Sequence, residues 1–138
     1  MKKRIWLLAS LLLIVALLAV GCTPHAKGME SPRWLTDAEK EAAIDIALAT
    51  PEAAAAEAEY DVYTTDFRWA VMYWYGKHAV LWWMDYDAVD DELPPEIQGE
   101  VDFYLEVIIR FGEPVQEMIR VALNPDTGKI VYTSAAEE

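Results

Sequence analysis

The sequence contains one cysteine, Cys22, in 138 residues, and it has few basic side chains. A single cysteine excludes an internal disulfide framework and a metal site built from several thiolates. The folded part must therefore be stabilised by packing. Only 11 lysine and arginine residues stand against 24 aspartate and glutamate residues, which gives a formal net charge of −13. A charge of this sign repels phosphate backbones, so we expect no nucleic-acid partner.

Side chains suited to nucleophilic or acid–base catalysis are also scarce. After residue 22 the serines are Ser31 and Ser134, and neither stands near a histidine in sequence. His25 falls in a segment rich in proline and glycine, and His78 falls in an expected hairpin turn, where side chains are solvated. A proton-transfer role needs a positioned partner, and no spacing in the sequence supplies one. We therefore predict a non-enzymatic protein that needs no cofactor.

The N-terminus has the features of an export signal. Lys2, Lys3 and Arg4 precede an uncharged apolar run over residues 5–20. This run is shorter than the roughly 20 residues that a membrane span needs, which favours a processed signal. The alternative is an uncleaved anchor helix with an incidental cysteine. Either arrangement places the folded part outside the cytoplasm and attached to a membrane.

Residues 18–22, Leu-Ala-Val-Gly-Cys, resemble a bacterial lipoprotein signal. The resemblance implies cleavage after Gly21 and lipid modification of Cys22, which would anchor the protein to the inner or the outer membrane; the sequence leaves that choice open. Residues 23–33 contain two prolines and a glycine and show no periodicity, which predicts a flexible tether. The chain is therefore expected to consist of a signal peptide over residues 1–21, a lipidated cysteine with a flexible tether over 22–33, one domain over 34–134 and an acidic tail over 135–138. All 24 acidic residues but only eight of the basic ones follow residue 21, so this part has a formal charge of −16.

Two helices are expected at the start of the domain. Thr36 and Glu39 form a Ser/Thr-x-x-Glu capping box, which predicts a helix from there to about Ala49. Thr50 and Pro51 predict a second, short helix to about Glu59, because proline fits the first helical turn. Both helices present mostly alanine on their apolar sides, so we expect them to pack closely against a sheet face crowded with large side chains.

Residues 60–86 are rich in aromatic and β-forming residues, which predicts a hairpin. Gly76 and Lys77 suit a two-residue type II′ turn, with Tyr75 opposite His78. The same register sets Arg68 opposite Asp85, where we expect an ion pair. One face of the hairpin is predicted to be core: Phe67, Trp69, Val71, Tyr73, Val80, Trp82, Met84 and Tyr86.

The rest of the chain predicts three more strands. Residues 101–111 alternate between apolar and polar side chains, and residues 112–114 are expected to form a three-residue loop that sets Phe111 opposite Val115 and Glu106 opposite Arg120 on the outside. A turn at residues 125–128 then sets Leu123 by Ile130 and Val121 by Tyr132. The expected fold is α+β: an N-terminal helix and a short second helix packed on an antiparallel sheet of about five strands in consecutive hairpins.

Two stretches of the domain resemble the PepSY family. They are residues 41–48, Glu-Ala-Ala-Ile-Asp-Ile-Ala-Leu, and residues 120–131, Arg-Val-Ala-Leu-Asn-Pro-Asp-Thr-Gly-Lys-Ile-Val. PepSY domains are small helix-plus-sheet modules of secreted protease propeptides and bacterial envelope proteins. The resemblance implies an inhibitory or regulatory role. The chain has Asn124 where the family usually has aspartate, and an additional aromatic hairpin. A cystatin-like arrangement of a helix wrapped by hairpins has a similar shape and stays an alternative.

An acidic cluster follows the hairpin and is a weak candidate for a calcium site. Its carboxylates are Asp85, Asp87, Asp90 and Asp91, and clusters rich in oxygen ligands can hold Ca²⁺. The spacing lacks the glycine and the distal glutamate of an EF-hand loop. A solvated acidic loop is therefore the preferred interpretation.

The second face of the hairpin is the candidate binding surface, with Met72, Trp74, Leu81 and Trp83 joined by Ile108. This face is covered either by the second helix or by Trp34 and Leu35, or else it is open and marks a binding site. An open face predicts a binding or regulatory module that acts on another envelope protein. The alternative is a lipoprotein that binds a small apolar or sugar ligand. The oligomeric state is left open.

Overall fold

The computed structural model describes residues 27–95, 97 and 100–137. The predicted signal peptide and the lipidation site at Cys22 lie outside these residues. The elements are helices α2 (Asp37–Leu48) and α3 (Pro51–Glu59) and strands β1 (Val62–Tyr75), β2 (His78–Asp85), β3 (Val101–Phe111), β4 (Glu117–Leu123) and β5 (Ile130–Glu137). The α+β class with a five-stranded antiparallel sheet is confirmed. Among the described residues, no helix is long and apolar enough to cross a membrane.

Both helices begin at the residues that the sequence predicts. The capping box of α2 is complete: the Glu39 N–H donates to Thr36 Oγ1 at 3.2 Å, and the Thr36 N–H donates to Glu39 Oε2 at 2.7 Å. Thr50 accepts from the Ala53 N–H, and Pro51 occupies the first turn of α3. These contacts satisfy N–H groups that a helix start leaves without partners, which fixes both starts.

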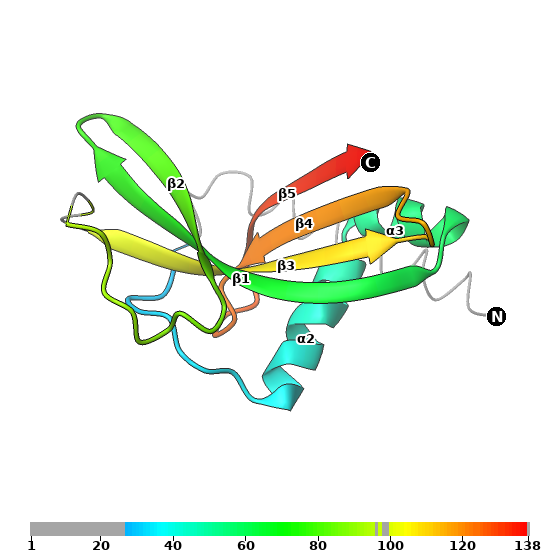
Figure 1. The fold of residues 1–138 in the computed structure, drawn as a ribbon, viewed down its shortest axis with the longest axis horizontal. Helices are drawn as coiled ribbons and strands as arrows, with labels where there is room; N and C mark the ends of the chain where they lie inside the picture. Colours follow the sequence, from blue (N-terminus) through cyan, green and yellow to red (C-terminus); the bar gives the residue numbers. More distant parts are fainter. Residues whose placement is uncertain (1–26, 96, 98–99, 138) are drawn as a thin grey trace.

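The strand order differs from a run of consecutive hairpins. The sheet runs β2-β1-β3-β4-β5, so β3 pairs with β1 and not with β2 (Figure 1). The expected consecutive hairpins therefore hold for β1–β2 and for β3–β4–β5, but not between β2 and β3. Instead, the acidic, proline-containing segment after Asp85 carries the chain past β1 to its other side. β1 becomes the strand that joins the hairpin to the rest of the sheet.

The strand registers agree with the sequence in part. Tyr75 pairs with His78 and Arg68 with Asp85, as predicted. In contrast, Phe111 pairs with Glu117 and not with Val115, because the β3–β4 loop is two residues longer than expected. A shift of two residues keeps every side chain on its predicted face.

The β4–β5 pair is irregular at one point. Leu123 pairs with Ile130 as predicted, but Tyr132 pairs with Ala122 and not with Val121. The cause is a register irregularity between Ala122 and Leu123. It moves Tyr132 onto the sheet face opposite the helices, since Ala122 belongs to that face.

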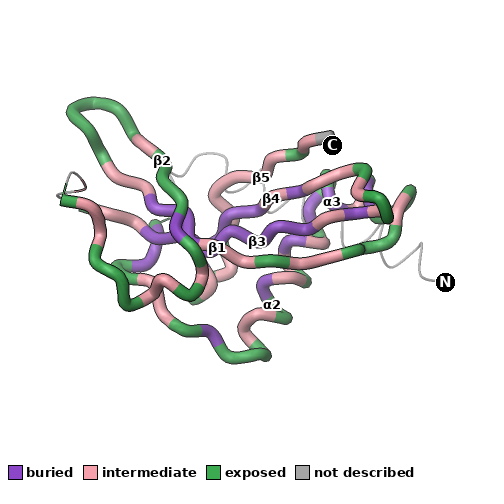
Figure 2. Tube along the Cα trace, in the orientation of Figure 1, coloured by how far each residue is buried: buried purple, intermediate pink, exposed green. Residues whose placement is uncertain are grey.

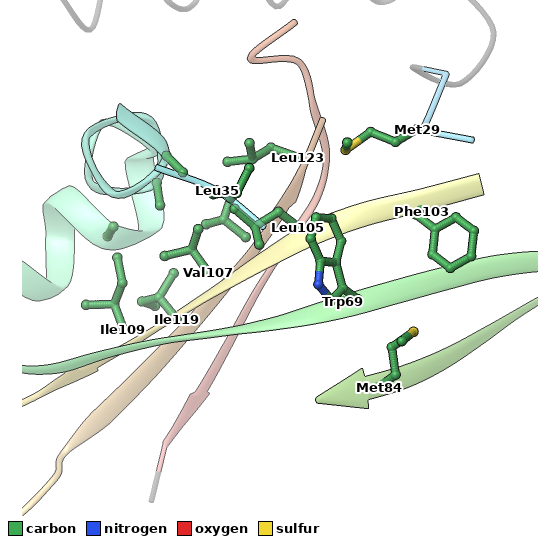
Figure 3. Packing of buried hydrophobic residues seen from close by; sticks show 14 of the residues in the cluster. Met29, Leu35, Trp69, Met84, Phe103, Leu105, Val107, Ile109, Ile119 and Leu123 are labelled. Carbon is green, nitrogen blue, oxygen red and sulfur yellow. The ribbon is translucent and has the colours of Figure 1, made fainter. Parts of the chain in front are cut away.

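The core lies between the helices and one sheet face (Figure 3). The helices contribute small buried side chains: Ala43, Ala47, Ala53 and Ala56. The sheet contributes large ones: Trp69, Phe103, Leu105, Ile109, Phe111 and Ile119. Small residues on a helix let its backbone approach a face that is already filled with bulky side chains, which keeps the packing dense. The alanine-rich helices are therefore matched to this sheet, as predicted.

The segment before α2 is attached to the domain, although the sequence predicts a flexible tether to residue 33. Met29 exchanges two backbone hydrogen bonds with Phe103, at 2.8 and 2.9 Å, and its side chain is buried in the core. Asn124 Nδ2 donates to the Lys27 carbonyl at 2.9 Å. A Cβ at Gly28 would lie 2.8 Å from that of Asp102, so only glycine allows this approach. The folded domain therefore includes the residues from Lys27 onward, and not only those from the predicted bound at residue 34.

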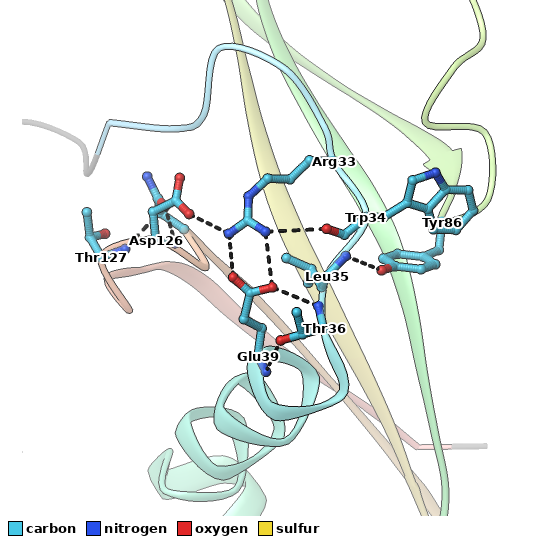
Figure 4. A network of polar contacts seen from close by, with 9 residues as sticks. Arg33, Trp34, Leu35, Thr36, Glu39, Tyr86, Asp126 and Thr127 are labelled. Carbon is cyan, nitrogen blue, oxygen red and sulfur yellow. Dashed lines mark hydrogen bonds and ion pairs between the residues drawn. The ribbon is translucent and has the colours of Figure 1, made fainter.

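Arg33 fastens this segment to two other parts of the fold (Figure 4). Its guanidinium forms a bidentate pair with Glu39, at 2.8 and 3.1 Å, and contacts Asp126 in the β4–β5 turn at 2.7 Å. These contacts lower the pKa of Glu39 from 4.5 to about 2, with the Arg33 hydrogen bond as the main cause and the Thr36 N–H as the second. Glu39 therefore serves both as the cap of α2 and as the anchor for Arg33.

Replacing Glu39 by glutamine is expected to reduce stability in a pH-dependent way. The folded state favours the ionised carboxylate, so its contribution is complete above pH 4.5 and is lost as the pH falls toward 2. Urea unfolding at pH 7, 4.5, 3 and 2 should show a wild-type advantage that shrinks through this range. Glu41→Gln, at an exposed position of the same helix, is the matched control. A wild-type advantage that stays constant from pH 7 to 2 would contradict this role.

Candidate functional site

The predicted binding surface lies on the β1–β2 hairpin, which extends beyond the helices (Figure 1). We call Met72, Trp74, Leu81 and Trp83 the hairpin face. Trp74 is 51% exposed, Trp83 42% and Leu81 37%, while Met72 is half-buried. The register places Met72 directly opposite Leu81 on the paired strand, with Trp74 two residues along β1 on the same face. The four side chains thus form one surface.

The groups that could have covered this face lie on the other side of the sheet. The Leu35 N–H donates to the Tyr86 hydroxyl at 2.9 Å, and the Trp34 ring meets Tyr86 edge-on at 5.4 Å. The buried alanines of α3 belong to the core cluster that contains Trp69. Ile108 is buried, so it does not extend the surface. Neither α3 nor the segment before α2 covers the hairpin face.

The hairpin tip is also exposed on the face that the sequence predicts to be core. Trp69, Val71 and Met84 are buried as expected, but Trp82 is 37% exposed and Tyr73 is only half-buried. Figure 2 shows that the residues of both strands are exposed toward the turn. The prediction for Trp82 was wrong because the helices lie under the base of the hairpin and not under its tip.

Arg68 has a different partner from the one predicted. It lies opposite Asp85 on β2, but it also lies opposite Glu106 on β3, and its Nε bonds to Glu106 Oε1 at 2.5 Å. Glu106 was expected to face Arg120 on the outside of the sheet, but Arg120 pairs with Ile108. Glu106 is 0% exposed and is a buried carboxylate that the sequence pattern did not predict.

Three donors converge on Glu106 from three strands. Besides Arg68 on β1, Trp83 Nε1 on β2 donates to Glu106 Oε2 at 3.0 Å, and the Tyr132 hydroxyl on β5 donates to the same oxygen. The Arg68 guanidinium also lies 4.7 Å from the Trp83 ring centroid. A buried charge needs both a counter-charge and hydrogen bonds, and Glu106 has both. The Glu106 cluster thereby holds one member of the hairpin face, Trp83, in place.

The cluster requires a curled sheet. In a flat sheet, strands spaced about 4.8 Å apart would separate β2 from β5 by about 19 Å. Here Trp83 Nε1 and the Tyr132 hydroxyl, from these two edge strands, lie 3.4 Å apart. The intervening strands carry the small residues Ala70 and Ala122 on this face, and both are fully buried. Their size lets the two edge side chains lean inward over β3.

The tyrosines of this face remain protonated at neutral pH. Burial raises the pKa of Tyr132 to about 12, and its hydrogen bond to Glu106 acts in the same direction. Burial, followed by the charge of Asp102, raises the pKa of Tyr104 to about 12. Neither hydroxyl is prepared to act as a base, because catalytic pKa values usually lie near the working pH. Tyr132 therefore serves Glu106 as a hydrogen-bond donor.

The other candidate residues are not brought together. Asp85, Asp87, Asp90 and Asp91 are all exposed, and within residues 27–95, 97 and 100–137 no three His, Cys, Asp or Glu side chains are placed to share a metal ion. His78 is exposed at the hairpin turn, and Ser31 is exposed before α2. The geometry therefore gives the calcium hypothesis no support.

The chain was compared with protein-family models, with curated proteins and with solved structures, and none of them matches it.

Proposed function

We propose that the protein is a lipid-anchored, extracytoplasmic and non-enzymatic binding module that acts on another envelope protein through the hairpin face. The observation that carries this proposal is the exposure of Trp74, Leu81 and Trp83 on one surface that no described element covers. Single-domain proteins rarely leave contiguous apolar patches bare unless they bind something. Tryptophan side chains are also enriched among the residues that dominate binding energy at interfaces.

The Glu106 cluster supports a preformed surface. Trp83 is held by its bond to Glu106, and the ring is further fixed by the Arg68 guanidinium. A side chain that is ordered before binding loses less conformational freedom when the partner arrives. Buried polar clusters of this kind stabilise one arrangement of the side chains around them. The hairpin face therefore suits recognition of a protein surface of fixed shape.

The charge of the domain indicates what the partner carries. Asp85 lies on β2 beside the hairpin face, and Asp102 pairs with Met72 across β1–β3. The chain after residue 21 has a formal charge of −16. Complementary potentials steer association and exclude wrong partners. We propose that the partner presents an apolar patch with a basic rim.

The remaining parts of the proposal come from the N-terminus and from the family resemblance. The lipoprotein-like signal at residues 18–22 supports an anchor at Cys22. The turn after Asn124 belongs to one of the two stretches that resemble PepSY domains; its Asn124 side chain accepts from the Asp126 N–H at 2.8 Å, and Gly128 has a φ of 73°. A regulatory role toward a neighbouring envelope protein is the function that this resemblance implies.

Trp74→Ala is expected to abolish capture of the partner. The full-length protein would be purified from cross-linked membranes, and co-purifying envelope proteins would be identified by mass spectrometry. Trp74 lies outside the Glu106 cluster, so its loss should leave the fold intact. The matched control is Trp34→Ala, an exposed tryptophan on the opposite side of the sheet.

The same membrane preparation tests the lipid anchor and distinguishes a protein partner from a small ligand. Loss of membrane association in Cys22→Ser would support the anchor, and a wild-type protein found in the soluble fraction would count against it. Equal capture by wild type and Trp74→Ala would reject the hairpin face as the binding surface. A sugar or small apolar ligand would instead change tryptophan fluorescence in the absence of any captured protein.

A further inference from the structure

Strand β2 forms an open edge of the sheet. Its eight residues pair with β1 alone among the strands of the described chain, and the pairing is regular from Tyr75–His78 to Arg68–Asp85. Every second residue of an edge strand directs its N–H and C=O groups outward, where they can pair with another chain. Natural proteins usually protect such edges with proline, bulges or charges within the strand. From Ala79 to Met84, β2 has none of these.

We propose that β2 pairs edge to edge and antiparallel with β2 of a second copy of this chain, so that two five-stranded sheets join into one. A two-fold axis perpendicular to the sheet keeps equivalent faces together, so each residue must oppose a residue of its own face. The proposed register is centred on Leu81, which lies opposite Leu81 of the second copy. The proposal goes beyond the binding function above and does not depend on it.

Charge complementarity selects this register. With Leu81 at the centre, Asp85 lies opposite Lys77 of the second copy, and the symmetry creates this pair twice. Trp83 lies opposite Ala79, so a large side chain meets a small one. Centring the pair on Trp82 would set Asp85 opposite Ala79 and lose both charge pairs. Opposite charges across an antiparallel ladder are favourable, and like charges are not.

The Asp85 carboxylate is exposed and open to such a contact. Arg68, its cross-strand neighbour, bonds to Glu106 instead. Lys77 is exposed at the other end of β2, in the hairpin turn. The edge therefore carries one negative and one positive group at its two ends, with a neutral strand between them. This is a self-complementary pattern for antiparallel pairing.

The acidic charge of the domain does not fall within the proposed contact. Charges farther apart than about 8 Å are largely screened at physiological ionic strength, and the ladder itself is neutral between Ala79 and Met84. Edge pairing also leaves both faces of the sheet free. The hairpin faces of the two copies would become one continuous surface.

Cysteine cross-linking of the full-length protein in its membranes tests the register. Leu81→Cys should give a disulfide-linked dimer under mild oxidation, because the two cysteines would face one another within the Cα separation of about 4.4–6.8 Å that a disulfide allows. Ala79→Cys is the matched control: in the Leu81 register its two copies are four residues out of step, about 13 Å along the strands. The wild-type chain measures any contribution from Cys22.

Charge reversal tests the two end contacts. In the Leu81→Cys background, Asp85→Lys and Lys77→Asp should each lower the dimer yield at least about fivefold, and the double reversal should restore it. Trp74 is on β1, away from the edge, so Trp74→Ala should leave the yield unchanged while it abolishes partner capture. This difference separates failure of the dimer from failure of the proposed function.

Three outcomes would overturn the proposal: no dimer from Leu81→Cys, equal cross-linking by Ala79→Cys or Trp82→Cys, or a double reversal that does not restore the yield. Assemblies larger than a dimer in native electrophoresis of the detergent-extracted wild-type protein would also reject it. They would indicate that β2 pairs head to tail with β5 of the next copy, an arrangement that does not close on itself.

Discussion

Glu106→Ala is expected to lower the free energy of unfolding by about 3 kcal/mol. The substitution leaves the Arg68 guanidinium, on the sheet face opposite the helices, without its buried counter-charge. The value lies at the low end for buried pairs, since the Arg68 side chain is 27% exposed and water can partly solvate it. The Trp83 and Tyr132 donors would lose their acceptor as well. Urea unfolding at pH 7 measures the difference.

Two other substitutions on the same sheet face give reference values for the stability lost in Glu106→Ala. Tyr132→Phe removes one donor and should cost about 1 kcal/mol. Asp66→Ala breaks the Arg110–Asp66 pair, which joins the same two strands but is exposed, and should cost less than about 1 kcal/mol. If Asp66→Ala were as costly as Glu106→Ala, burial would not be what makes the Glu106 cluster important.

Trp69→Ala is expected to cost about 4 kcal/mol, within the usual range for a buried tryptophan. Trp69 is fully buried at the centre of the core (Figure 3), and its ring stacks on Tyr86 with centroids 6.1 Å apart. Truncation would remove this stacking and leave a cavity in the core, where the buried residues of the helices are alanines that cannot fill it. Thermal and urea unfolding measure the effect, with the exposed Trp82→Ala as control.

Trp69→Phe should be much less harmful, costing less than about 2 kcal/mol. Trp69 Nε1 is buried and has no hydrogen-bond partner among the described residues. An unpaired buried donor carries a desolvation cost of about 1–3 kcal/mol, and phenylalanine removes it. This gain offsets part of the lost ring area. If Trp69→Phe lowered stability as much as Trp69→Ala, the indole N–H would have to be hydrogen-bonded in the folded protein, which would contradict this prediction.

Local patterns predicted the helices and the hairpin well because their signals are short-range. The Thr36–Glu39 capping box and the Thr50–Pro51 pair mark helix starts within four residues, and Gly76 fixes the hairpin register at the turn. The β3–β4 register was missed by two residues. Alternation has a period of two, so a shift of two keeps the same apolar face and the pattern cannot detect it.

The candidate site was predicted only in part for a related reason. The hairpin face follows from alternation, but the role of Glu106 depends on pairing between β1 and β3, which brings Arg68 next to a residue 38 positions away. Tyr132 enters only because of the irregularity beside Ala122. The available clue was in residues 103–109, Phe-Tyr-Leu-Glu-Val-Ile-Ile, where Glu106 is the one charged residue in an otherwise apolar run, as in a strand covered on both sides.

The attachment of Met29 to Phe103 limits how far the domain can lie from the bilayer. Cys22 is five residues before Lys27, whose carbonyl is bonded to Asn124. Five extended residues span at most about 18 Å. If Cys22 carries the lipid that we propose, the start of β3 and the β4–β5 turn would be held within that distance of the headgroups. The domain would then reach partners mainly by lateral diffusion along the membrane, because the segment between Cys22 and Lys27 is too short to let it move far from the bilayer.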